Sequence, residues 1–424
     1  MKSINLINLA IRRGCLATVL CLCAGICCAQ SVGEGLHFSG FGSLGTSYVG
    51  APDGWVYKRE FSQSGNNNAQ DLDSRLGLQL NYSLNEKFEL VGQAILRKRP
   101  TAAPTSDSIE WAFAAYRPNA DWMLRLGRVN VDAFIMTDHR NVGFAYTYAR
   151  PPVEFYSQIP TSLDGADLTR IWNTDDALWQ AKVFAGGGNA TSGSGLSKIK
   201  GRKVAGITVS REAAGLLLRI SLVQAHMTFD SEPLQLLVDN LDSLTALPIP
   251  TVATQAKDFQ SQITTNDRKH TYASFGARYE RADWLLSGEV ANISGSNQFG
   301  VSAGYASLGR RFGPLMIYAI SSRMHTRSAP VDTPDWATPL TFFGPQVAQQ
   351  AQYLARTAAD VINGFGIRQK SVSVGSRWDL TSELALKVQW DRIRVDANGS
   401  GAWANASLDA AHANVGSVML DFVF

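Results

Sequence analysis

The stretch DSRLGLQLNYSLNEKFELVGQAILRK, residues 73–98, decides the fold class of this chain. In its first half, leucines and one tyrosine at the even positions from 76 to 82 alternate with polar residues or glycine at the odd positions. Successive side chains of a β-strand point to opposite faces, so this period of two predicts a strand with one apolar and one polar face. The connection Asn85–Lys87 is short and polar, which indicates a tight turn into a second strand, Phe88–Lys98.

Strands of this kind follow one another along almost the whole chain. The pattern predicts sixteen of them: His37–Val49, Asp73–Leu84, Phe88–Lys98, Ser108–Arg117, Trp122–Asn130, Ser162–Thr174, Ala177–Gly188, Gly201–Ala213, Gly215–Phe229, His270–Ala282, Trp284–Gly295, Phe299–Gly313, Pro314–Thr326, Ile367–Leu380, Leu384–Asp396 and Asn414–Phe424. A soluble β-sandwich would show the same alternation. The lengths of the connections between strands must therefore decide whether the outer face of the sheet meets water or lipid.

The connections between the strands alternate in length. Seven are tight turns, at 85–87, 118–121, 174–176, 214, 282–283, 313–314 and 381–383. The eight between them are mostly long, at 50–72, 99–107, 131–161, 189–200, 230–269, 296–298, 327–366 and 397–413. Aromatic residues flank most of the tight turns, as expected at a membrane boundary. Short turns opposite longer loops are typical of outer-membrane barrels, so the sequence predicts an all-β fold, a 16-stranded antiparallel transmembrane β-barrel.

The polar faces of the predicted strands carry many charged side chains. A dry interior would bury them at a high free-energy cost unless all were paired, so the sequence favours a wide barrel with a water-filled interior. The predicted inward-facing residues are Arg75, Gln79, Glu89, Gln93, Arg97, Arg125, Lys182, Arg219, Ser221, Arg278, Glu280, Glu289, Arg377, Lys387, Gln389 and Asp421.

The N-terminal segment has the layout of a secretory signal peptide. Basic residues up to Arg13 precede an apolar run, Cys15–Cys28, and the small residue Ala29 marks a cleavage point. The run is short for a membrane-spanning helix, so a retained anchor is the weaker alternative. We therefore expect a signal peptide at 1–29 and a barrel at 30–424, placed in the cell outer membrane after cleavage.

Composition excludes several classes of function. All five cysteines lie in residues 15–28, so the mature chain has no cysteine for a zinc site or a thiol nucleophile. Removing the three basic residues of the signal from 39 leaves 36, which equals the 36 acidic residues, so nothing indicates nucleic-acid binding. The six histidines show no metal-ligand spacing, and no cofactor is expected. An outer-membrane enzyme remains an alternative, although no nucleophile motif supports it.

The two ends of the mature chain resemble those of the Gram-negative outer-membrane porin family. The chain closes on an alternating strand, Met419–Phe424, with a terminal phenylalanine, and its first mature strand contains Phe38–Gly42, FSGFG. The resemblance covers essentially all of residues 30–424. It implies a 16-stranded trimeric barrel, a homotrimer embedded in the lipid bilayer of the outer membrane, through which small hydrophilic solutes or ions diffuse passively.

The resemblance also implies a constriction. The fifth predicted strand ends at Leu126–Arg128, and in trimeric porins the loop after strand five folds into the barrel, which here would be Val131–Pro160. The acidic constriction motif of general enteric porins is absent from this loop. The candidate pore-lining residues are Arg75, Arg97, Arg99 and Arg125 on the wall, and Asp132, Asp138, Arg140 and Glu154 in the loop. In the alternative interpretation, each of these arginines only forms a salt bridge on a wetted wall.

In the first third of the barrel, wall arginines are denser than inward-facing acidic residues, and Arg128 adds to the four wall arginines named above. This excess predicts slight anion selectivity or none. We interpret the chain as a porin for passive diffusion of small hydrophilic solutes. A substrate-selective channel for organic or inorganic anions is the alternative, because basic wall residues would serve both. Two loop segments, Glu232–Leu244 and Gln346–Ile362, are expected to be helices that cap or plug the mouth, contact another subunit, or lie on the surface.

Overall fold

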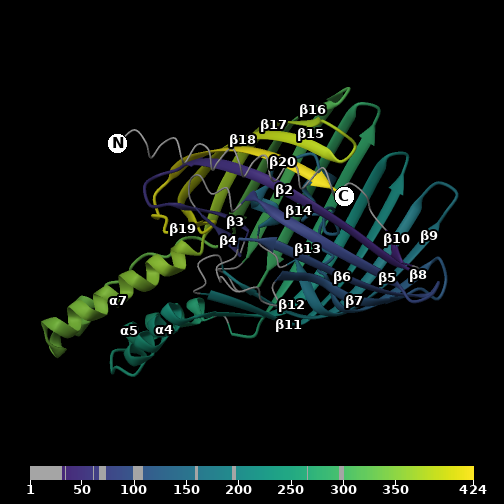
Figure 1. The fold of residues 1–424 in the computed structure, drawn as a ribbon. Helices are drawn as coiled ribbons and strands as arrows, with labels where there is room; N and C mark the ends of the chain where they lie inside the picture. The colour runs from purple at the N-terminus through teal and green to yellow at the C-terminus, as the bar shows by residue number, and fades with distance from the viewer. Residues whose placement is uncertain are drawn as a thin grey trace, which may run out of the picture.

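The structure is a computed structural model that describes residues 31–33, 35–60, 62–65, 73–98, 108–157, 161–192, 197–264, 266–295 and 300–424. The predicted signal peptide lies outside these ranges. Within them the chain forms a closed antiparallel barrel with helices projecting from one end (Figure 1).

Sixteen strands pair with their neighbours and close into a ring, because the last strand returns to pair with the first. They are β2 (Leu36–Gly50), β5 (Arg75–Ser83), β6 (Phe88–Arg97), β7 (Ile109–Tyr116), β8 (Trp122–Asn130), β9 (Ser162–Asn173), β10 (Leu178–Thr191), β11 (Ser197–Ala213), β12 (Leu216–Ser231), β13 (Arg268–Arg281), β14 (Trp284–Ser294), β15 (Val301–Phe312), β16 (Leu315–Thr326), β17 (Ile367–Asp379), β18 (Leu384–Ser400) and β20 (Ala411–Val423). A short strand, β1 (Ser31–Gly33), pairs with the start of β2. The sixteen predicted strands and the barrel fold are confirmed, with strand ends that differ by a few residues.

Each strand alternates between the two faces of the barrel wall. Along β16, Met316, Tyr318 and Ile320 are buried inside, whereas Ile317 between them is half exposed on the outside. The outer face of the wall carries many exposed apolar side chains, among them Leu44, Val183, Ile220, Val290 and Val374. Lipid offers no hydrogen bonds, so a closed ring that pairs its own backbone and presents apolar side chains outward suits a bilayer.

The first and last strands, which carry the porin-like segments, meet at the seam of the barrel. Residues 41–50 of β2 pair in antiparallel register with residues 414–423 of β20. A Cβ atom on Gly42 would lie 2.3 Å from Cζ of Phe422, and one on Gly40 would lie 2.2 Å from Cζ of Phe424. The glycines of the opening strand therefore leave room for the aromatic rings of the closing strand.

A small second sheet sits in the loop-side mouth of the barrel. It consists of β3 (Val56–Glu60), β4 (Gln63–Ser64) and β19 (Trp403–Ala404). The rings of Tyr57 and Trp403 lie 5.1 Å apart between centroids, and the pair packs in one buried cluster with the inward-facing Met324 and Ile393. This sheet occupies the mouth on the side of β16 to β20 and brings charged residues of β3 into the barrel.

The helices come from two long loops. The loop between β12 and β13 forms α4 (Glu232–Thr245) and α5 (Pro250–Ile263), and the loop between β16 and β17 forms α6 (Ala337–Leu340) and α7 (Pro345–Gly364). They share a buried core that includes Leu241, Trp336 and Ala355, and they extend away from the barrel (Figure 1). The two predicted helices are confirmed as α4 and α7, whereas α5 was not predicted. None of the helices in the described part of the chain is long and apolar enough to cross a membrane.

Candidate functional site

The connection between β8 and β9 lies inside the barrel. Its described part, residues 131–157, is called the inner loop below, and it contains α3 (Val153–Tyr156). Side chains of the wall hold its backbone: Thr208 donates to the carbonyl oxygen of Asp132 at 2.6 Å, and Ser274 donates to that of Ala133 at 3.1 Å. Buried polar groups need such partners, so the inward-facing hydroxyls of β11 and β13 fix the course of the loop.

Lys387 of β18 holds the opposite part of the inner loop. Its ammonium group donates to the carbonyl oxygens of Gly143, Tyr146 and Tyr148 at 2.6, 2.6 and 3.1 Å, and it pairs with Asp421 at 2.9 Å. The side chain is 0% exposed. An ammonium has three donors, and here each has a backbone acceptor, so one buried cation orders a whole turn of the loop.

Aromatic side chains fill the space between the inner loop and the wall. Phe134 of the loop packs on Tyr272 with ring centroids 5.9 Å apart, and Tyr148 packs on Tyr318 at 5.4 Å. One continuous buried cluster joins loop residues to inward-facing residues from β8 to β16. Packed side chains therefore fill the part of the barrel interior next to β8–β16.

Four of the predicted pore-lining residues form contacts within the wall or between the inner loop and the wall. Asp132 pairs with Lys182 at 3.0 Å and with Arg219, so it ties the loop to β10 and β12. Arg125 forms a bidentate ion pair with Asp167 on the neighbouring strand, at 2.6 Å. The contacts of Arg125 correspond to the alternative interpretation, in which an arginine only forms a salt bridge on the wall.

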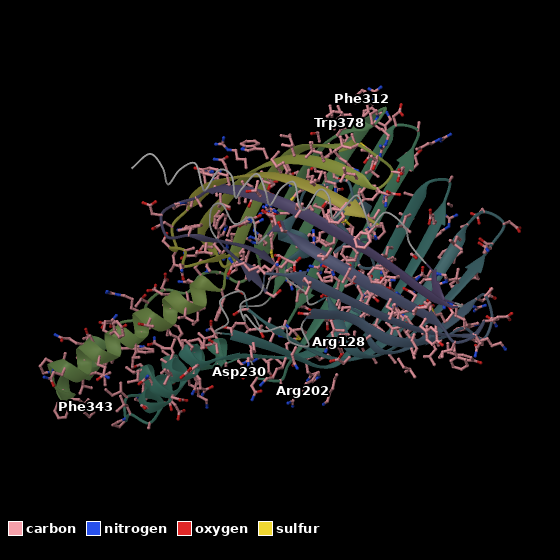
Figure 2. All side chains as sticks on the ribbon, viewed as in Figure 1. Arg128, Arg202, Asp230, Phe312, Phe343 and Trp378 are labelled. Carbon is pink, nitrogen blue, oxygen red and sulfur yellow. The ribbon has the colours of Figure 1, made fainter. Side chains whose placement is uncertain are left out.

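The two remaining loop carboxylates have similar anchoring roles. Glu154 accepts hydrogen bonds from Ser322 and Gln369, both at 2.7 Å, and Asp138 accepts one from Asn130. Arg128, which contributed to the predicted selectivity, points out of the barrel and pairs with Asp164 at 2.7 Å (Figure 2). Arg99 lies outside the described residues.

The structure brings the other three predicted residues together around one narrow cavity of about 70 Å³. Arg75 reaches it from β5, Arg97 from β6 and Arg140 from the inner loop. Four more charged side chains line it. Arg150 belongs to the predicted constriction loop, whereas Arg59, Glu60 and Asp73 were not predicted as pore-lining residues. We call the five arginines, Arg59, Arg75, Arg97, Arg140 and Arg150, the arginine cluster.

The arginine cluster is held by two carboxylates. Glu60 lies 2.7 Å from Arg97 and 3.9 Å from Arg140, while Asp73 pairs with Arg59 and lies 3.5 Å from Arg150. Five cations and two anions leave a net charge of +3 around the cavity. Buried cations around a narrow cavity produce a strong local field because little solvent screens them.

Several donors of the arginine cluster have no hydrogen-bond partner within the described ranges. They are Nε of Arg59 and Arg97 and one terminal nitrogen each of Arg140 and Arg150. All four side chains are nearly buried, at 5, 6, 7 and 11% exposed. Such donors can form hydrogen bonds with water or with the acceptor atoms of an anion that enters the cavity.

The cluster also sets the ionisation of Glu60. Burial alone would raise the pKa of this carboxyl, but Arg97, Arg140 and Arg75 lower it to about 2. A carboxyl with a lowered pKa contributes stability that is complete above its unfolded value of 4.5 and is lost as the pH falls towards 2. Glu60 is therefore an anion throughout the range in which the channel would work.

We expect Glu60→Gln to raise the anion-over-cation permeability ratio roughly twofold, because one negative charge leaves the cavity. The difference between wild type and variant should be nearly complete at pH 4 and be halved only near pH 2, where half of the Glu60 carboxyls are protonated. Reversal potentials measured from pH 7 to pH 2 check this. A difference that is already halved at pH 4.5 would mean that the arginines do not act on Glu60 as described.

A larger cavity of about 660 Å³ adjoins the arginine cluster on the loop side, and Glu60 lines both. We call it the vestibule. Its inward-facing wall is mostly apolar, and includes Leu163, Val204, Val223, Met227, Ile293 and Met324. The predicted polar interior is therefore found around the arginine cluster and at residues such as Gln79 and Arg278, whereas the apolar wall of the vestibule was not predicted.

Comparison with known proteins supports the barrel fold, but it does not identify a solute or a selectivity. No family model and no curated protein matches this sequence. Among solved structures, OmpF of Salmonella typhi in complex with daunomycin is 12% identical, with a TM-score of 0.51, over 92% of this chain and 98% of its own. The outer membrane channel DcaP of Acinetobacter baumannii is 11% identical, with a TM-score of 0.51, over 93% and 99%. OmpT of Vibrio cholerae is 11% identical, with a TM-score of 0.50, over 92% and 99%. The chain thus shares the architecture of outer-membrane barrels across nearly its whole length.

Proposed function

We propose that this protein is a passive, non-enzymatic channel of the outer membrane that admits small hydrophilic solutes and favours anions. The single observation that carries the proposal is the arginine cluster, with its net charge of +3 and its unpartnered buried donors at the narrow point between the inner loop and β5 and β6. Size is limited by the narrow cavity, and charge is selected by the field of the arginines. The barrel fold and its apolar outer face support a place in the bilayer.

Reversal potentials of the refolded mature protein across a KCl gradient in planar bilayers test the charge preference. We expect chloride to pass more readily than potassium, because the cavity is positive. A clear preference for potassium would contradict the role of the arginine cluster, and no conductance in any preparation would contradict the channel itself.

Liposome swelling distinguishes a general pore from a selective one. A general pore admits neutral sugars at rates that fall smoothly with their size, whereas a selective channel admits organic anions and excludes sugars of equal size. Trimeric assembly, which we also propose from the porin-like ends of the chain, would appear as three equal closing steps in single-channel records.

A further inference from the structure

The vestibule differs from a simple water-filled entrance because its wall is apolar where the barrel faces the loop side. β12 shows the reason: Val223, Ala225 and Met227 point inward, next to Leu163 of β9 and Val204 of β11. Lys58, Glu60, His270 and Tyr272 are the titratable side chains among its described lining residues. A solute that enters here meets apolar surface before it meets the arginine cluster.

The vestibule and the cavity of the arginine cluster lie next to each other, because Glu60 lines both of them. Arg59, the residue before Glu60, belongs to the arginine cluster. A volume of about 660 Å³ lies within the range of pockets that hold small organic molecules. An apolar body can therefore rest in the vestibule while its anionic end reaches towards the arginines.

We propose that the preferred solutes are organic acids with an apolar body, such as monocarboxylates with an aliphatic chain or an aromatic ring. This inference rests on the proposed function and names its substrate class. Each methylene transferred from water to apolar surface favours binding by roughly a factor of 3 to 4, so a longer chain gains affinity here. Acetate and neutral sugars gain nothing from the same wall.

The test measures how acetate, butyrate and hexanoate block the chloride current of single channels. We expect the half-blocking concentration to fall at least roughly tenfold from acetate to hexanoate. Val223→Thr combined with Met227→Gln keeps the side-chain volumes and makes the wall polar, and should reduce that ratio to roughly threefold or less. Hexylammonium and hexanol, which share the chain but lack the carboxylate, serve as controls for effects on the bilayer.

Equal half-blocking concentrations for the three acids would overturn the proposal, and so would a chain-length dependence that the double variant leaves unchanged. Both results keep the anion-favouring current and so leave the proposed function intact. A channel that prefers cations or carries no current would instead refute the proposed function. The two failures are therefore distinguishable in one set of recordings.

A second, independent observation concerns the outside of the barrel. Arg323 of β16 stands directly opposite Lys370 of β17, which stands opposite Arg394 of β18. Arg392 lies two residues away on β18, and His412 of β20 is opposite Arg394. All five belong to the exposed, outward-facing set of their strands. We call them the basic row.

Like charges directly opposite one another destabilise a sheet unless something neutralises them. In the described part of the chain, Arg394 is the one member that pairs with a carboxylate, Asp396 at 3.2 Å. On the side towards the tight turns, the next outward-facing residues are apolar on β17 and β18, where Val372 and Trp390 are both about half exposed. On β16 and β20 one polar residue, Ser321 or Asn414, comes first, and the apolar residues Ile317 and Val418 follow further along. The basic row therefore lies where the apolar belt ends on the loop side, at the level of lipid head groups.

The geometry points to a phosphate-bearing lipid of the outer leaflet as the partner of the basic row. Closely spaced guanidinium and ammonium groups bind phosphate oxygens through charge-assisted hydrogen bonds, and a membrane surface presents such phosphates at this height. Seating one phosphate between adjacent strands would relieve the repulsion within the row.

Native mass spectrometry of the purified protein with lipid A and with its dephosphorylated form tests this partner. We expect the phosphorylated lipid to be retained and the dephosphorylated lipid to be lost, and we expect Arg323→Gln, Lys370→Gln and Arg394→Gln together to reduce retention at least tenfold. Lys87→Gln with Arg281→Gln, exposed at the tight turns, is the matched control. Equal retention of both lipids, or full retention by the triple variant, would overturn the proposal.

Discussion

Replacing Arg75, Arg97 and Arg140 by glutamine abolishes the anion preference of the channel. The three substitutions take the net charge around the narrow cavity from +3 to zero, since two arginines and two carboxylates remain. Glutamine keeps much of the side-chain length and some hydrogen bonding, so the cavity changes mainly in charge. We expect the permeability ratio of chloride to potassium to fall to about one, because the field that separates the two ions is gone.

Reversal potentials in a KCl gradient give this ratio directly. Arg128→Gln is the matched control, because Arg128 sits on β8 but faces out of the barrel and pairs with Asp164 (Figure 2). The control should leave the ratio unchanged. If the triple variant kept the preference of the wild type, selectivity would have to arise elsewhere along the passage.

The barrel could be predicted from sequence because its signal is local. Each strand alternates between lipid and interior within itself, and each tight turn joins two neighbours, so residues 73–98 already contain the repeating unit. The inward direction of Arg75 and Arg97 followed from the same alternation. These features need no knowledge of which distant segments meet.

The composition of the site could only partly be predicted, because it depends on contacts between distant segments. Arg59 and Glu60 belong to a loop whose return into the barrel is fixed by the packing of Tyr57 on Trp403, 346 residues further along the chain. The run Lys58–Glu60 was a signal of charge in that loop, but no local rule placed it beside Arg97. Likewise, nothing near Asp132 shows that it meets Lys182 and Arg219 instead of the passage.

The apolar vestibule was missed for a different physical reason. On β12 both faces are apolar at the same height, with Leu222 towards the outside and Val223 towards the inside. Alternation then carries no information about which face is wet. Only the closed ring shows that several such inward residues converge on one side of the mouth, while the charged ones gather around the arginine cluster.

Lys387→Met releases the inner loop and widens the passage. Methionine has a similar length but no donors, so the carbonyl oxygens of Gly143, Tyr146 and Tyr148 and the carboxylate of Asp421 lose their shared partner. Removing one member of a buried ion pair typically costs about 3–5 kcal/mol, and the unpaired carboxylate here has no exposure to water that would offset it. The loop can avoid much of this cost by moving away from β18, which admits water to Asp421.

Two measurements follow from that movement. Single-channel conductance should rise and become noisier, and the temperature at which the barrel unfolds in a gel-shift assay should fall. Lys269→Met, an exposed, outward-facing lysine on β13, is the control and should change neither. Arg377 also donates to the carbonyl oxygens of Phe144 and Tyr146, so the loop should loosen without leaving the barrel. An unchanged conductance together with a lowered unfolding temperature would show that Lys387 stabilises the wall without setting the width of the pore.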